Sequence, residues 1–420
     1  VFCHARNRGE QPAAVTGRPA MTDNFQRTST DLLDDAQAGA VAVLPSGEHL
    51  TEAAHQHISD DVKVKFAGGD TFLIVLRERV DEFFSSTGRR RRDCTEMYVK
   101  TAAIALWVIV SYVLLVAWAT TWWQALLLST SLGLAMAGVG FNIQHDGGHS
   151  AYSSRKWINN LMAMTLDLLG GSSYIWKRTH NLVHHSFTNI TGHDGDIDLS
   201  PLGRLSPHQK RFAFHRLQHV YLWVLYGFVT FKWQFFDDIL GIVTERIGKT
   251  RLPRPRGWQL VVFVSGKLLF VSLAFVIPML LHPWHVVLLF FFAASFVQGL
   301  MLSVVFQLAH CVQEADFPMP REGTGRMENA WAVHQVETTV DFARRNRFVT
   351  WYTGSLNHQI EHHLFPQICH VNYPAIAELM EETCRDFGVR YSSHQTLLAA
   401  VGAHYRWLRQ MGRPTTAAVT

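Results

Sequence analysis

Histidine clusters stand out in this chain of 420 residues, which contains 23 histidines. The first is His145-Asp-Gly-Gly-His149, the second is His180-Asn-Leu-Val-His184-His185, and the third is Gln359-Ile-Glu-His362-His363. One more histidine, His310, follows a long apolar segment. Imidazole nitrogens are good ligands for iron, copper, nickel and zinc. The clusters therefore predict a site for two metal ions with four or five protein ligands each.

Helical spacing would bring the side chains of each cluster together. Residues four apart lie one turn apart on the same face of a helix, so His145 would lie beside His149 and His180 beside His184. Gln359, His362 and His363 would also share a face. His358 lies one turn before His362, but it would point away from His363. For His358 the spacing favours a surface or supporting position over metal binding.

Carboxylates accompany the histidines. They are Asp146, Asp194, Asp196, Asp198 and Glu361. A metal-bound imidazole usually donates its second N–H to such a group, so these residues are candidates for orienting the ligands. A solvated turn is an equally good interpretation of the run from Asp194 to Asp198. Gly147 and Gly148 would each cost a helix about 1 kcal/mol, and we expect them to permit a close approach of backbone or substrate.

Four long segments almost free of charge indicate how the clusters are positioned. They are Thr101–Trp118, Gln124–Ile143, Trp258–Leu281 and Trp284–Phe306. Each approaches or exceeds the roughly 18 apolar residues that cross a bilayer core, and tryptophans lie near their ends, as at membrane interfaces. Very short connections join them in pairs, which predicts two helical hairpins in a membrane. Two buried hairpins in a soluble domain are the alternative, which uncharged runs of this length disfavour.

Basic residues indicate the orientation of these spans. Arg89–Arg92 precede the first span, three arginines up to Arg256 precede the third, and three more up to Arg347 follow the fourth. The positive-inside rule then places both termini and the segment Gln144–Gly257 in the cytoplasm. All histidine clusters would meet on that face, whereas His282 and His285 would lie on the other. The Asn189-Ile-Thr191 sequon would stay unmodified.

Polar residues interrupt two further apolar segments, Trp157–Trp176 and His219–Phe236. We expect helices at the membrane interface or beneath the spans, not crossings. Lys267 is the one charge inside a span, where it is costly unless it faces protein or a cavity.

Composition excludes several classes of protein. Charged residues make up only 17% of the chain and the net charge is +4, which gives no support for nucleic-acid binding. The five cysteines include no CxxC pair, so a disulfide scaffold or zinc ribbon is not expected. Residues 1–60 are polar, lack a signal-peptide core and are expected to be flexible, with Met21 a candidate natural start. We assign no role to His4, His49, His55 or His57. Residues 61–410 would form the main domain and 411–420 a tail.

The clusters and their order resemble those of the membrane fatty acid desaturases over most of Asp61 to His404. The motifs HDGGHSAYS, WKRTHNLVHHSFTNITGHDGDID and GSLNHQIEHHLFP carry the resemblance. Gln359 stands where many desaturases have histidine, which is typical of the front-end subgroup that includes linoleoyl-CoA and delta-6 type enzymes. The resemblance and the spans together predict an all-α integral membrane protein, with four spans in two hairpins and a cytoplasmic helical cap that holds a diiron site.

The resemblance also implies an activity. Two Fe ions, O2 and two electrons would introduce a cis double bond into a fatty acyl-CoA or acyl-lipid, at a position counted from the carboxyl end. The implied ligands are His145, His149, His180, His184, His185, His310, His362 and His363, with Gln359 at the position of a ninth. No HPGG haem motif occurs in the sequence, so electrons would come from a separate cytochrome b5 or ferredoxin.

Other interpretations stay open at this point. A lipid hydroxylase of the same superfamily would have similar histidine clusters, and a metal transporter or sensor would place ligands inside the spans. The same imidazoles would accept zinc. Phe290, Phe291, Phe292 and Phe296 could line an acyl channel, although packing against lipid is the alternative for most of them. The expected location is a bacterial plasma membrane.

Overall fold

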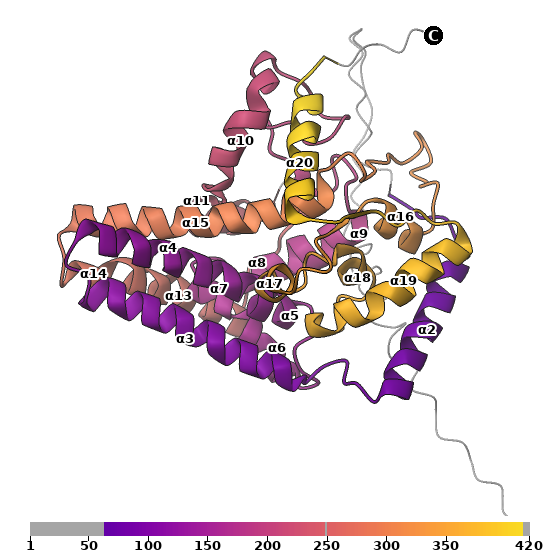
Figure 1. Cartoon of the computed structure of the whole chain (residues 1–420). Helices are drawn as coiled ribbons and strands as arrows, with labels where there is room; N and C mark the ends of the chain where they lie inside the picture. The colour runs from indigo at the N-terminus through magenta and orange to yellow at the C-terminus, as the bar shows by residue number, and fades with distance from the viewer. Residues whose placement is uncertain (1–62, 248–249, 415–420) are drawn as a thin grey trace, which may run out of the picture. The chain divides into compact units, whose positions relative to one another are not determined.

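The computed structural model describes residues 63–247 and 250–414, which are mostly helical (Figure 1). The expectations for residues 1–60, including four of the histidines, lie outside the described residues, as does most of the tail. The strands are only two residues long: β1 (Arg246–Ile247) pairs antiparallel with β2 (Thr250–Arg251), and β3 (Asp341–Phe342) pairs parallel with β4 (Ser393–His394).

Four helical stretches in the described residues are long and apolar enough to cross a membrane. The first is α3 (Thr95–Ala117), and the second joins α4 (Trp122–Gly138), η1 (Val139–Gln144) and α5 (His145–Gly148). The third joins α13 (Trp258–Val271), η6 (Ser272–Val276) and α14 (Ile277–Met279), and the fourth is α15 (Trp284–His310). The four predicted spans are therefore confirmed as apolar helices.

Their boundaries differ from the prediction in a way that matters for the site. Helix α3 begins at Thr95 and not at Thr101, because the polar first turns pack against the protein: Lys100 is only 6% exposed. The second stretch continues without a break to Gly148, and α15 continues to His310. Two of the apolar helices therefore carry candidate ligands at their own ends.

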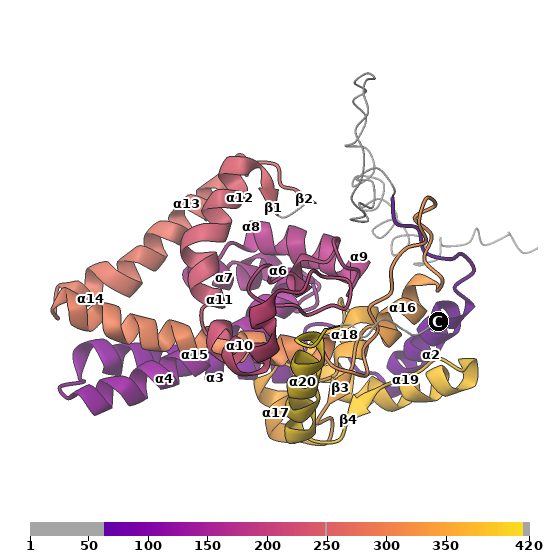
Figure 2. The ribbon, with the colours of Figure 1, turned by 90° about the horizontal axis from the view of Figure 1, so that it is seen from above.

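Helix α4 lies between α3 and α15 and packs against both. A glycine permits the close approach, because a Cβ at Gly133 would lie 2.8 Å from the Cβ of Val297 in α15. Helix α13 instead diverges from α15, as Figure 2 shows, and packs against α7 (Thr165–Leu168). There a Cβ at Gly266 would lie 2.7 Å from the Cβ of Asp167.

Short helices follow the second and precede the third apolar stretch. They are α6 (Lys156–Ala163), α7, α8 (Ser173–Trp176), η2 (Lys177–His184), α9 (His185–Phe187), η3 (Gly195–Ile197), η4 (Ala213–Leu217), α10 (Gln218–Tyr226), α11 (Val229–Lys232), η5 (Trp233–Asp237) and α12 (Asp238–Thr244). None of them is among the four helices that could span a membrane. Lys267 faces α12, where its Nζ lies 2.8 Å from Oδ2 of Asp238, so the charge in the third span is paired with protein.

The C-terminal third adds α16 (Trp331–Glu337), α17 (Arg347–Tyr352), α18 (Gln359–Leu364), η7 (His370–Asn372), α19 (Tyr373–Phe387) and α20 (Leu397–Met411). Helix α2 (Thr71–Thr87) packs on α19 through a core that includes Leu76, Val80, Ile376 and Met380. Figure 1 shows α16, α18 and α19 at the end of the apolar helices opposite α14. This group of helices carries the third histidine cluster to the ends of the second and fourth apolar stretches.

Candidate metal centre

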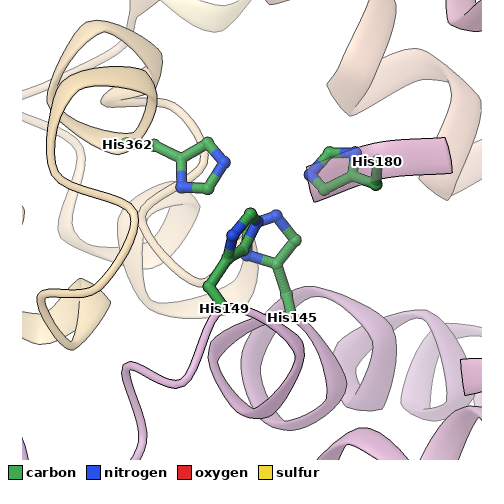
Figure 3. A group of neighbouring side chains, drawn as sticks. All are labelled: His145, His149, His180 and His362. Atoms are coloured by element: carbon green, nitrogen blue, oxygen red, sulfur yellow. The ribbon is translucent and has the colours of Figure 1, made fainter. Parts of the chain in front are cut away.

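Histidines from three separate segments meet in a first buried group. It consists of His145, His149, His180 and His362, and one ring nitrogen of each lies within 4.8 Å of those of the others. Figure 3 shows the four rings directed toward a common point, with His145 and His149 from adjacent turns of one helix. The segments come from the end of the second apolar stretch, from η2 and from α18. The long-range association that the sequence predicted is therefore present.

A second group lies beside the first. His184, His310 and His363 bring one ring nitrogen each within 4.8 Å of one another, and all three are buried. His185 lies between the groups: its Nε2 is 3.0 Å from Nε2 of His362, and its ring stacks on that of His363 with centroids 4.4 Å apart. Gln359 adjoins the second group, because its amide nitrogen is 3.0 Å from Nε2 of His310. All nine predicted site residues are thus brought together.

Local helix geometry explains how neighbours in sequence serve different groups. The second cluster spans η2 and the first residue of α9. At the end of η2, a π-helical segment, the N–H of His185 bonds the carbonyl of His180. Such wide turns are rare and often found at functional sites. His180 and His184 still stack, with ring centroids 5.1 Å apart, but His180 joins the first group and His184 the second. Another π-helical segment, η1, directly precedes His145.

The glycines of the first cluster permit close packing, as expected. A Cβ at Gly147 would lie 2.6 Å from the backbone nitrogen of Ala163, and one at Gly148 would overlap the ring of Trp176. The Trp176 ring in turn stacks on His180, with centroids 4.4 Å apart. The two glycines therefore allow other parts of the protein to pack closely against the first cluster. The packing of Trp176 fixes the orientation of the His180 ring, a candidate ligand.

Polar residues outside the three histidine clusters orient the rings of the second group. Oδ2 of Asp194 lies 3.0 Å from Nδ1 of His184, and Oε1 of Gln335 lies 2.8 Å from Nδ1 of His363. Each contact directs the opposite ring nitrogen, Nε2, toward the group. The orienting role predicted for Asp194 agrees with this geometry, whereas Gln335 was missed because an isolated glutamine 28 residues away gives no sequence signal.

Asn189 is a second residue that sequence analysis missed. Its amide nitrogen donates to the carbonyls of His310, Thr338 and Asp316 at 3.0, 3.0 and 3.2 Å. Its backbone N–H donates to Asp194 at 2.9 Å, and it adopts a φ of 58°, a conformation that asparagine tolerates better than most residues. The side chain is fully buried and ties the second cluster to the end of α15.

The other carboxylates have different partners. Oδ2 of Asp196 lies 3.6 Å from Nδ1 of His180, whereas Asp198 accepts a hydrogen bond from the backbone of Ser200 in an exposed turn. Oδ2 of Asp146 lies 2.9 Å from Nδ1 of His370. Glu361 accepts a hydrogen bond from Tyr391, and His358 lies 3.9 Å from the other Glu361 oxygen.

Burial keeps most of these imidazoles neutral. Desolvation, together with repulsion by neighbouring imidazoles, lowers the pKa of His149, His180, His185, His362 and His363 well below the usual value. Burial also acts to lower the pKa of His184, but attraction to Asp194, the hydrogen bond to Asp194 and attraction to Asp196 together outweigh burial and raise this pKa. Neutral imidazole is the form that binds a metal, and the nearby Asp194 carboxylate would favour positive charge at the second group.

The donor set fits metal ions. Nε2 of His149, His184 and His363 is buried without a hydrogen-bond partner, although such atoms are costly to bury unsatisfied. A cation bound at each group would give these converging, unpartnered ring nitrogens a partner. Two adjacent groups made almost entirely of imidazole suit iron or zinc.

An apolar cavity of about 590 Å³ lies close to the site. It is bordered by α3, α4, α7, η6 and α15, with Ile143 and Met162 near the histidines and Ala119 and His282 at the distant end. Phe290 and Phe291 line it, whereas Phe292 and Phe296 stack on each other and contact Phe228 edge to face. The channel expected from the four phenylalanines therefore involves only two of them. Two contacts join α3 to the third apolar stretch and the residues that follow it. The hydroxyl of Tyr112 donates to the carbonyl of Leu273 at 2.7 Å, and Nε2 of His282 lies 2.7 Å from the carbonyl of Val116.

The profile of the family described as "Fatty acid desaturase" matches residues 120–395. The chain is 38% identical to an sn-1 linoleoyl-lipid 6-desaturase of Arthrospira platensis, over 85% of this chain and 97% of that protein. It is 36% identical to the protein of that name from Synechocystis, over 84% of this chain and 98% of the relative.

A plant relative is also similar. An acyl-lipid (8-3)-desaturase of Physcomitrium patens is 37% identical over 82% of this chain and 72% of its own length. The region that matches the family, residues 120–395, contains every histidine of the two groups. The chain therefore belongs to the fatty acid desaturase family of membrane oxidoreductases, which use O2 to desaturate fatty acyl chains.

Proposed function

We propose that this protein is a front-end acyl-lipid desaturase with two iron ions at the histidine groups. The observation that carries the proposal is the convergence of eight buried histidines in two adjoining groups. His145, His149, His180 and His362 would hold one iron. His184, His310 and His363 would hold the other, with His185 between them and Gln359 beside His310. Bound iron would supply the O2 chemistry that removes two hydrogens from adjacent methylenes.

The protein's own residues would prepare this site. Asp194 and Gln335 hold the rings of His184 and His363 with Nε2 directed inward. Burial of every histidine in both groups excludes bulk water, which limits side reactions of the oxidant. Asn189 holds the end of α15 against the second cluster, so that His310 is placed by backbone contacts and not by its own side chain alone.

The apolar cavity is a candidate for the acyl chain. Its volume falls within the range of about 300–1,000 Å³ typical of ligand sites, and Ile143 at its inner end is close in sequence to His145. A bilayer is already apolar, so an acyl chain that moves from lipid into the cavity gains little hydrophobic free energy. Selection among chains would therefore depend on the shape of the cavity and on the distance from the headgroup to the irons.

A lipid-linked substrate and a front-end position fit the relatives, whose names specify acyl-lipid or linoleoyl-lipid substrates. A headgroup anchored at the membrane surface would fix the distance from the carboxyl carbon to the irons. The new double bond would then be counted from the carboxyl end.

The membrane arrangement we propose has two hairpins, with both termini and the helical cap in the cytoplasm. Support comes from the basic residues beside the spans and from the position of the histidines at the ends of two of them. Val220, Val224 and Phe236 on the short helices are 61%, 56% and 67% exposed, which suits helices in the membrane interface. The membrane would be a bacterial plasma membrane, with electrons supplied by a separate cytochrome b5 or ferredoxin.

Expression in a host with defined fatty acids tests the proposal. Gas chromatography of the lipids should show a new cis double bond at a fixed distance from the carboxyl group. Hydroxylated chains would instead support a lipid hydroxylase. Bound metal with no change in the lipids would support a transporter or sensor.

A further inference from the structure

A chain of three buried ionisable residues lies beside the histidine groups and has no part in them. Nζ of Lys100 is 2.9 Å from Nε2 of His370, and Nδ1 of His370 is 2.9 Å from Oδ2 of Asp146. Lys100, His370 and Asp146 are 6%, 1% and 2% exposed. Burying an isolated lysine or aspartate is costly, so the three groups must compensate one another.

The chemistry of the three side chains fixes the role of the imidazole. An ammonium group can only donate and a carboxylate can only accept. A neutral His370 accepts from Lys100 at Nε2, and its Nδ1 faces the Asp146 carboxylate at 2.9 Å in a close polar contact that is not aligned as a hydrogen bond. The imidazole therefore bridges the Lys100 ammonium and the Asp146 carboxylate, which do not contact each other directly.

The same place could be mistaken for another metal site. Ligand atoms of Asp146, Cys369 and His370 lie within 4.8 Å of one another. The Lys100 ammonium already provides a positive charge at His370, and a metal ion there would be repelled by it. The cluster is better explained as an ion pair with a bridging histidine.

The contacts join three segments that are far apart in sequence. Lys100 belongs to α3, Asp146 directly follows His145, and His370 belongs to η7 just beyond the third cluster. The backbone N–H of His370 also donates to Asp146 at 3.2 Å, and that of Cys369 donates to the carbonyl of Arg91 at 2.8 Å. The ion pair thus holds the helix that carries His145 and His149 against the segment that carries His362.

We propose that His370 is a positioning residue: with Lys100 and Asp146 it aligns the first histidine cluster with the third, so that His145, His149 and His362 can bind one metal ion together. The inference rests on the proposed metal centre and adds to it a residue that touches no ligand. The second group should depend on it much less, because His184, His310 and His363 are oriented by Asp194, Gln335 and Asn189.

The test uses the full-length protein purified in detergent, with iron measured per chain and the visible spectrum recorded after replacement by Co²⁺. Lys100→Met and Asp146→Asn should each reduce the metal content from two ions per chain to about one, with loss of one component of the spectrum. Outer residues of this kind typically change metal affinity by about 10–100-fold. His370→Leu should act in the same way, whereas His370→Gln, which keeps a donor and an acceptor, should retain more metal.

The double variant Lys100→Met/Asp146→Asn provides a sharper test. Each single change leaves a buried charge without its partner, but the double change removes both charges, so it should recover metal relative to either single variant. The matched control is Lys267→Met/Asp238→Asn with its single variants. These residues form another ion pair, between α13 and α12 at 2.8 Å, with Asp238 buried and Lys267 partly buried. Their replacement should leave two metal ions bound.

The outcomes separate the two proposals. A wild-type protein that binds no metal would overturn the metal centre and this inference together. Two ions in the wild type and also in Lys100→Met, Asp146→Asn and His370→Leu would overturn the inference alone. Equal loss of both ions, or the same loss in the Lys267 controls, would also overturn it, because it would indicate general destabilisation.

Discussion

Gln359 directs its amide nitrogen to Nε2 of His310, 3.0 Å away, and so joins the start of α18 to the last turn of α15. An amide is a weaker ligand for iron than an imidazole. At this position the amide contacts a nitrogen of a proposed ligand, so Gln359 lies at the edge of the second group.

Gln359→His should alter or abolish desaturation while two metal ions stay bound, because the new imidazole would compete for the metal at the second group. Activity and double-bond position should be measured for acyl chains of two lengths. In the wild type the bond should keep its distance from the carboxyl end. Unchanged rate and position in the variant would mean that Gln359 has no functional role.

His184→Ala and His363→Ala should each abolish activity and lower the metal content. Each replacement removes a buried nitrogen that has no other partner. Metal analysis and lipid chromatography provide the measurements. His285→Ala is the control, since this exposed histidine lies at the opposite end of α15 from His310, and it should behave as the wild type. Full activity of either variant would contradict the ligand assignment.

Asp194→Asn should weaken metal binding by about 10–100-fold, because a neutral amide orients and polarises His184 less well than a carboxylate. Retention of metal during dialysis against a chelator measures the effect. The same substitution at Asp198, an exposed residue in the same loop, should change nothing. Equal retention in the two variants would show that the Asp194 charge is unimportant.

Ala125→Phe should shorten the acyl chains that the enzyme accepts. Ala125 is 7% exposed and lines the cavity, so a larger ring would fill part of it. The ratio of products from a long and a short acyl chain should fall by about tenfold, within the usual range for steric discrimination. Leu127→Phe changes a residue of the same helix that is 63% exposed and should leave the ratio as it is. A fall in both variants, or in neither, would argue against this cavity as the acyl site.

Reporter fusions at both termini and near Pro283 should place the termini in the cytoplasm and Pro283 outside it. The physical reason is the grouping of arginines beside the spans. An external C-terminus would contradict the proposed topology, since it would separate the third histidine cluster from the first two.

The sequence was sufficient to predict the four apolar helices and the histidines of both groups. Length and lack of charge indicate the helices, and histidine spacing indicates the candidate ligands. It could not indicate which ligand belongs to which group. His180 and His184, and likewise His362 and His363, are divided between the groups by local backbone geometry.

Residues that support the ligands were harder to predict. His370 gave no signal, because its role depends on Lys100, 270 residues away, and on Asp146, 224 residues away. Gln335 and Asn189 are similar cases, since their importance arises only from contacts made in the folded chain. Asp194 was expected to support a ligand because it is close to His184 in sequence.

The distribution of the histidines along the chain also constrains biosynthesis. Each group contains one histidine of the third cluster, His362 in the first and His363 in the second. During translation, neither group can be complete until all four apolar helices have been made and most of the chain has left the ribosome. If the two groups bind metal as proposed, both sites would be completed only after these helices have been made, and a chain truncated before α18 would lack one histidine of each group.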